Sequence, residues 1–191
     1  MNILLFKIYS WLRVWRKNFL NDYMLYRYGR QISSHGKFDL DHTARIVFQT
    51  STSKLVVGSG FLVRSYCSVL LTDKGEIRIG DNVFLNRCCS LNAMEMIVIG
   101  DNTILGENVK IYDHNHLFRD RTQLIRDQGF KKAPVRIGKN CWIGSDCTIL
   151  PGVTIGDNVV VGAGNLIYKS IEANSVIVSK REIINLNSSE L

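Results

Sequence analysis

The chain has 191 residues, of which 46% are hydrophobic and 21% charged, a composition that indicates one globular domain with at most a short appendage. The formal net charge of +7 permits an anionic partner, but no nucleic-acid-binding motif or base-stacking aromatic platform is present, so nucleic acid is not expected. The five cysteines are odd in number and lack C-x-x-C spacing, which argues against disulfide or zinc frameworks and favours a reducing cytoplasm.

Residues 1–30 are predicted to form a basic amphipathic helix. Apolar residues recur at helical spacing in "MNILLFKIYSWLRVWRKNFL", but no uninterrupted apolar run approaches the roughly 18 residues of a membrane span, and no A-x-A cleavage site follows. Basic residues among Trp and Leu are typical of a peripheral membrane contact, while packing on this domain or on a neighbouring subunit is the alternative. The segment holds one acidic residue, Asp22, and six basic ones: Lys7, Arg13, Arg16, Lys17, Arg27 and Arg30.

From about residue 57 an aliphatic residue recurs every six positions. The clearest units, over residues 137–166, read IGKNCW, IGSDCT, ILPGVT, IGDNVV and VGAGNL. Six residues fit the two-residue period of a strand but not the 3.6-residue period of a helix, and the Gly, Asp and Asn residues are typical of turns. Each hexapeptide is therefore predicted to form a short strand and a corner, with its aliphatic side chain in a column that stacked coils bury.

Three hexapeptides make one triangular coil, so the repeat predicts a β-helix of about five coils. The coils begin at Val57, Ile79, Ile99, Ile137 and Ile155, with spacings of 22, 20, 38 and 18 residues. Spacings above 18 indicate insertions at corners. The predicted organisation is a helical segment at 1–30, a β-helix domain at 31–178 and a C-terminal tail at 179–191.

The longest insertion, near residues 117–136, directly follows "IYDHNH", which holds two of the four histidines. A loop this long in a tight solenoid is usually functional or disordered, and its charged sequence predicts that it is extruded from the prism. In an extended backbone His114 and His116 point to the same side. A catalytic base, half of a metal site and solvated turn residues are the three interpretations of the pair.

The tandem hexapeptides, with "NVKIYDHNH", a loop and "VRIGKNCWIGSDCTILPGVTIGDNVVVGAGNLIYKSI", resemble the hexapeptide-repeat acyltransferases over about residues 55–178. The resemblance is closest to the maltose, galactoside and nodulation-factor O-acetyltransferase branch and to polysaccharide-biosynthesis acetyltransferases. It implies an all-β, left-handed parallel β-helix that forms homotrimers, with acetyl-CoA bound between subunits and no metal. The implied activity is O-acetylation of a sugar hydroxyl, on a cell-surface polysaccharide or its lipid-linked precursor.

The resemblance places the catalytic base at His116 by hexapeptide register, with His114 as the next candidate and Asp113 as a residue that orients one imidazole. An imidazole, with an ordinary pKa of about 6.5, can accept the proton of a hydroxyl that attacks a thioester and then protonate the leaving thiolate. The reaction therefore needs no acyl-enzyme and no catalytic cysteine.

Further site positions are also implied by the resemblance. Asn86 matches an acceptor-binding asparagine, although a structural corner asparagine is the alternative, and Trp142 is expected to stack on a ligand or merely to cap a corner. The positions expected to contact acetyl-CoA are Trp142, Ser145, Ala163 and Lys169.

Two departures from the family pattern concern the ends of the chain. Residues 1–30 stand where the maltose branch has a different extension, and "IEANSVIVSKREII" lacks the Gly-x-Pro that the family places after "NS". Both favour surface-glycan acetylation by a cytoplasmic protein at the inner face of a membrane. The alternatives are N-acetylation of an amino sugar, a non-catalytic scaffold, and a three-histidine zinc enzyme like the γ-class carbonic anhydrases, for which His35 and His42 lie far from the pair in sequence.

Overall fold

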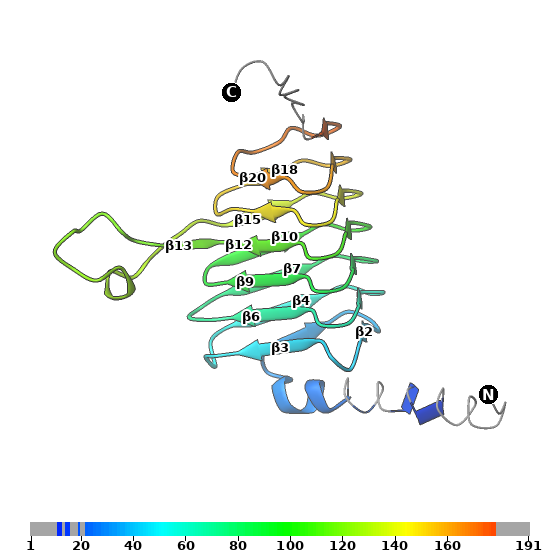
Figure 1. The fold of residues 1–191 in the computed structure, drawn as a ribbon. Helices are drawn as coiled ribbons and strands as arrows, with labels where there is room; N and C mark the ends of the chain where they lie inside the picture. Colours follow the sequence, from blue (N-terminus) through cyan, green and yellow to red (C-terminus); the bar gives the residue numbers. More distant parts are fainter. Residues whose placement is uncertain (1–10, 13, 16–18, 20–21, 179–191) are drawn as a thin grey trace, which may run out of the picture.

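The computed structural model describes residues 11, 12, 14, 15, 19 and 22–178. These residues form a column of stacked coils with three parallel sheets along its sides (Figure 1). Each full coil contributes one strand to each sheet, so the neighbours of a strand come from the coils before and after it. The predicted all-β parallel β-helix is confirmed.

The three sheets are numbered in the order in which their first strands, β1, β2 and β3, occur in the chain. The first sheet contains β1 (Ile32–Ser34), β4 (Lys54–Val57), β7 (Glu76–Ile79), β10 (Met96–Ile99), β15 (Val135–Ile137) and β18 (Thr154–Ile155). The second sheet contains β2 (Asp39–Leu40), β5 (Leu62–Val63), β8 (Phe84–Leu85), β11 (Ile104–Leu105), β16 (Trp142–Ile143), β19 (Val160–Val161) and β21 (Val176–Ile177). The third sheet contains β3 (Arg45–Phe48), β6 (Ser68–Leu71), β9 (Ser90–Ala93), β12 (Lys110–Tyr112), β17 (Thr148–Ile149) and β20 (Leu166–Ile167).

The β-helix begins one coil earlier than the repeat predicted. Strands β1, β2 and β3 form a complete coil below the one that contains Val57, and β1 pairs in register with β4. Register aligns Ser34, Leu40 and Ile46 with Val57, Val63 and Val69, so the six-residue spacing continues into this coil. Its first position holds a serine, so the aliphatic repeat did not reveal it. At the other end, β21 pairs with β19 and starts a seventh turn.

The hexapeptide pattern determines which side chains enter the core. In the middle coil, the inward residues Ile99, Leu105 and Ile111 are completely or almost completely buried, whereas the outward residue Ile104 is 46% exposed. The corners turn through residues in the left-handed region, such as Asn102 at φ 58°, a conformation that asparagine tolerates better than most residues. Stacking therefore buries one continuous aliphatic column, as the repeat predicted.

The described part of the N-terminal segment is helical at residues 11, 12, 14, 15, 19 and 22–28. Met24 and Tyr28 pack against the core at the first coil. No described helix is long and apolar enough to cross a membrane. The other residues of the predicted helix at 1–30, and the predicted tail at 179–191, lie outside the residues that the structure describes.

The excursion from the prism begins with the histidines rather than after them. Beyond β12, strand β13 (His114–His116) pairs antiparallel with β14 (Phe130–Lys132), and the chain returns at β15. A short 3-10 helix, η1 (Ile125–Asp127), lies between the two ribbon strands. This ribbon and its loop project from the column (Figure 1). The predicted extruded loop is thus confirmed, with the histidine strand as its first part.

Burial predicts that the same truncation destabilises the protein strongly at one leucine and hardly at another. Leu105 is fully buried and Leu166 is 56% exposed. We expect Leu105→Ala to lower the free energy of unfolding by about 2–5 kcal/mol, since it removes core contacts and leaves a cavity. Leu166→Ala should change it by no more than about 0.5 kcal/mol. Urea denaturation measures both, and equal losses would contradict the assigned orientation of the two side chains.

Candidate active site

The site is built where the ladder of backbone hydrogen bonds is interrupted. In the coil below, the Thr72 N–H donates to the carbonyl of Ala93, and the register predicts that the Met94 N–H should donate to the carbonyl of Asp113. That carbonyl instead accepts from the Ala133 N–H at 2.8 Å, where the excursion returns. The Asp113 side chain replaces it: its carboxylate accepts from the Met94 N–H at 2.9 and 3.1 Å and from the Glu95 N–H at 2.8 Å. Asp113 is therefore a fully buried carboxylate with a structural role.

The same carboxylate contacts His114. Oδ1 of Asp113 lies 2.9 Å from Nδ1 of His114, whose side chain is 19% exposed. A carboxylate that accepts two backbone N–H bonds is an acceptor for the ring as well, so we infer that Nδ1 of the neutral imidazole carries the hydrogen. Nε2 is then left with a lone pair, which is the arrangement that a general base requires.

His116 lies on the exposed part of the ribbon and has a different environment. Its ring centroid is 4.4 Å from that of Phe130, and the same phenyl ring meets His114 edge-on at 5.4 Å. No carboxylate among the described residues forms an ion pair with His116. Phe130 therefore contacts both histidines from the opposite strand of the ribbon. No sequence motif singled out this residue.

An ion pair attaches the ribbon to the prism, and a backbone hydrogen bond extends the ribbon beyond its strands. Lys132, paired with His114 across the ribbon, forms an ion pair with Asp73 on the coil corner below, and its hydrogen bond lowers the pKa of the Asp73 carboxyl. The Leu117 N–H donates to the Gly129 carbonyl at 3.0 Å. These contacts position the histidines beside the corner between the third and first sheets.

Most of the other predicted site residues lie elsewhere on the same chain. Asn86, Ser145 and Ala163 lie at the corner between the second and third sheets, where the Asn86 side chain accepts from the Arg87 N–H at 3.0 Å and Ser145 Oγ accepts from the Glu107 N–H at 3.1 Å. Trp142, 56% exposed, lies on the outer face of the second sheet. Lys169 follows β20 at the third-to-first corner, with its ammonium group 5.7 Å from the centre of the Tyr168 ring.

One chain therefore does not bring the predicted site together. Asp113, His114, His116 and Lys169 belong to the corner between the third and first sheets, while Trp142, Ser145, Ala163 and Asn86 belong to the second sheet and its corner with the third. In a three-sided prism, the corner between the third and first sheets is opposite the second sheet. Contact between the two groups requires two copies of the chain.

The outer face of the second sheet is apolar from β5 onwards, after Asp39 of β2. Register places Leu62, Phe84, Ile104, Trp142, Val160 and Val176 in one ladder from coil to coil. Outward positions of a solvated strand are usually polar, so a row of six apolar residues marks an interaction face.

Four of the five cysteines belong to the core. Cys67, Cys89, Cys141 and Cys147 are buried, whereas Cys88 is exposed. Burial raises the pKa of the Cys141 and Cys147 thiols, which disfavours the thiolate that a nucleophile needs. Among the described residues, no group of three or more His, Cys, Asp and Glu side chains is arranged to hold a metal ion.

Comparisons with known proteins agree with the fold and the motifs. The family model "Hexapeptide repeat of succinyl-transferase" matches residues 134–169. A galactoside O-acetyltransferase of Escherichia coli K12 is 38% identical over 53% of this chain and 49% of its own length. A putative lipopolysaccharide biosynthesis O-acetyl transferase of the same strain is 34% identical over 54% and 57%, so the chain spans about half the length of these curated relatives. The crystal structure of a maltose O-acetyltransferase from Clostridium difficile 630 superposes with a TM-score of 0.54, at 33% identity, over 78% of this chain and 66% of that one.

The Asp113 contact predicts the tautomer of His114. We expect neutral His114 to carry its hydrogen on Nδ1, because the neighbouring carboxylate is an acceptor. Long-range proton–nitrogen correlation spectra of nitrogen-15-labelled protein distinguish the two tautomers, with His114→Gln providing the assignment. An Nε2–H tautomer for His114 would contradict the proposed dyad geometry.

Proposed function

Because the chain belongs to the hexapeptide-repeat acyltransferase family, we propose that it transfers an acetyl group from acetyl-CoA to a hydroxyl group of a carbohydrate. The observation that carries the proposal is the contact between the buried Asp113 carboxylate and Nδ1 of His114 at the base of the projecting ribbon. The relatives that are named O-acetyltransferases support the reaction class.

His114 is proposed as the general base. Its Nε2 accepts the proton of the acceptor hydroxyl while the hydroxyl oxygen attacks the thioester carbonyl carbon. The tetrahedral intermediate then expels the CoA thiolate, the carbon–sulfur bond breaks, and the imidazolium returns the proton to sulfur. Asp113 holds the imidazole in the required orientation and stabilises its positive charge between the two transfers, as the aspartate of a catalytic triad does.

The choice between the two histidines follows from their environments. The hexapeptide register favoured His116, but the described carboxylate that contacts an imidazole in this strand is next to His114. His116 and Phe130 lie side by side at the ribbon surface, where they are proposed to form a wall against which the acceptor sugar packs. His114 is therefore the proposed base and His116 a proposed acceptor contact.

A homotrimer is proposed because the predicted residues are divided between two edges of the prism. The corner that carries His114 would meet the neighbouring subunit's second sheet, whose outer ladder includes Ile104 and Trp142. Acetyl-CoA would then lie between subunits, with Trp142, Ser145, Ala163 and Lys169 as its proposed contacts and Asn86 as a proposed acceptor contact. The apolar ladder would be covered by the same association.

The proposed acceptor is a cell-surface polysaccharide or its lipid-linked precursor, modified on the cytoplasmic side of a membrane. The similarity to a putative lipopolysaccharide biosynthesis O-acetyl transferase supports this class over a free disaccharide. Acetylation of an amino sugar is the competing reaction. An amine is a better nucleophile than a hydroxyl, so it depends less on a base.

Activity should depend much more on His114 than on its neighbour. We expect His114→Ala to lower kcat by about 10²–10⁴-fold, since general-base catalysis contributes factors of this size. His116→Ala should mainly raise KM. The measurement is CoA release with a panel of sugars, amino sugars and lipid-linked glycans. Full activity of His114→Ala together with an inactive His116→Ala would contradict the assignment, and turnover of amino sugars alone would favour N-acetylation.

Mixed oligomers test whether the site is shared between subunits. His114→Ala and the double variant Asn86→Ala/Trp142→Ala should each be inactive alone, because each removes one side of the proposed site. Random co-assembly in equal amounts should restore about a quarter of wild-type activity, since about one interface in four combines two intact sides. Chains denatured and refolded separately before mixing are the control. A site within one chain predicts no recovery.

A further inference from the structure

The N-terminal end of the molecule carries a row of exposed aromatic side chains. Trp11, Trp15 and Phe19 are helical, more than half exposed and separated by four residues, which places them along one side of the helix. The rings of Trp15 and Phe19 stack with centroids 5.6 Å apart and an interplanar angle of 12°. Tyr23 and Tyr26 are also exposed. A row of exposed aromatic side chains marks an interaction surface.

The helical turns at residues 22–28 are fixed to the prism by their other side. Met24 and Tyr28 pack against the core, and the Tyr28 ring lies 5.1 Å from that of Phe48. The side chain of Gln31 donates to the carbonyls of Thr50 at 2.8 Å and Ser53 at 3.3 Å. The aromatic row is thus connected to a well-anchored end of the β-helix.

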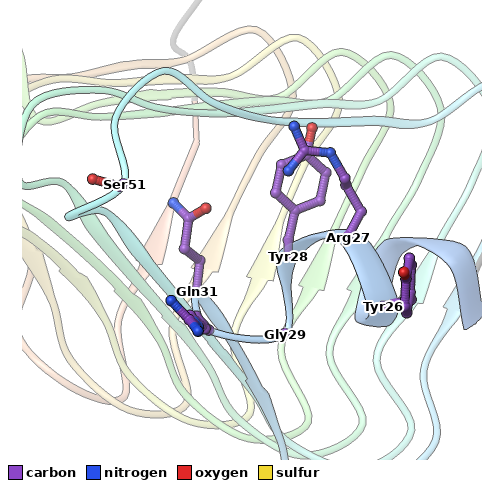
Figure 2. Close-up of a pocket in the computed structure, with 7 residues that line it drawn as sticks. Tyr26, Arg27, Tyr28, Gly29, Gln31 and Ser51 are labelled. Carbon is purple, nitrogen blue, oxygen red and sulfur yellow. The ribbon is translucent and has the colours of Figure 1, made fainter.

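Positive charge adjoins this row. A cavity of about 370 Å³ is lined by Arg27 and Arg30 together with Tyr26, Tyr28, Gly29, Gln31 and Ser51. Figure 2 shows the Arg27 guanidinium beside Tyr28, with Tyr26 directed elsewhere, and the guanidinium carbon lies 5.3 Å from the Tyr28 ring centre. No carboxylate of the described residues forms an ion pair with either arginine. Both guanidinium groups can therefore donate hydrogen bonds to a bound anion.

The positive charge of residues 1–30 favours an anionic partner over a second copy of the same segment. Residues 1–30 contain six basic residues and one acidic residue, so a second copy of this end would be repelled by the first. An anionic surface would be attracted. Trp and Tyr side chains beside Arg and Lys are the combination that binds at the boundary between lipid headgroups and acyl chains.

We propose that this end of the protein binds the surface of a bilayer that contains anionic phospholipid. Trp11, Trp15 and Phe19 enter the interfacial layer, and the cavity between Arg27 and Arg30 receives a lipid phosphate. The binding depends on this surface alone and not on the proposed acetyl transfer.

Vesicle co-sedimentation of the full-length protein tests the proposal. We expect at least about tenfold tighter binding to phosphatidylcholine vesicles with 30 mol% phosphatidylglycerol than to pure phosphatidylcholine, and loss of that difference in about 0.5 M salt, where surface charges are screened. Trp11→Ala/Trp15→Ala and Arg27→Gln/Arg30→Gln should each weaken binding by about tenfold or more. The matched controls, Phe118→Ala and Arg119→Gln/Arg121→Gln, change exposed residues of the distant ribbon loop and should bind like wild type.

Three results would overturn the proposal. The first is no binding to anionic vesicles, and the second is an equal loss in the ribbon controls, which would indicate general electrostatic attraction. The third is a change of oligomeric state in Trp11→Ala/Trp15→Ala without a change in vesicle binding, which would assign the row to a subunit contact. Acetyl transfer to a soluble acceptor should be unaffected by the N-terminal variants, so failure here is distinct from failure of the proposed function.

Discussion

The structure depends on a backbone ladder that must continue from coil to coil. Among the described residues, no strand of the three parallel sheets pairs within its own coil, so these strands satisfy their N–H and C=O groups through the coils above and below. The aliphatic column is buried by the same stacking. Any excursion from the prism leaves backbone donors of the preceding coil without their acceptors, and those donors must be satisfied in another way.

At the one long excursion, Asp113 supplies the missing acceptors. Its carboxylate takes the N–H groups of Met94 and Glu95, and its own carbonyl closes the excursion by accepting from Ala133. The geometry of the proposed active site follows from this replacement of the missing acceptors by the Asp113 carboxylate. A carboxylate held by two backbone bonds is fixed without any contribution from the imidazole, so it can orient His114 at little further entropic cost. The structural and the proposed positioning roles of Asp113 are therefore one arrangement.

The sequence reveals much of the fold because the fold is itself periodic. A six-residue repeat directly reports which side chains enter the column, as Ile99, Leu105 and Ile111 show. The first coil was missed because Ser34 stands where the later coils have an aliphatic residue, although Leu40 and Ile46 keep the six-residue spacing. The contact of Phe130 with both histidines was also missed, because it depends on antiparallel pairing across the excursion, where no repeat applies. The hexapeptide register favoured His116, whereas the proposal of His114 rests on a hydrogen bond to a buried carboxylate that register does not report.

We propose that the site is completed between two copies of the chain, with His114 as its base. A crystal structure of the protein with bound CoA tests it most directly. We expect the CoA sulfur to lie near Nε2 of His114 in one protomer, with the rest of the CoA molecule along the Trp142 and Ser145 edge of its neighbour. CoA bound entirely to one protomer would contradict a site shared between subunits, and a CoA sulfur remote from His114 would contradict its proposed role as the base.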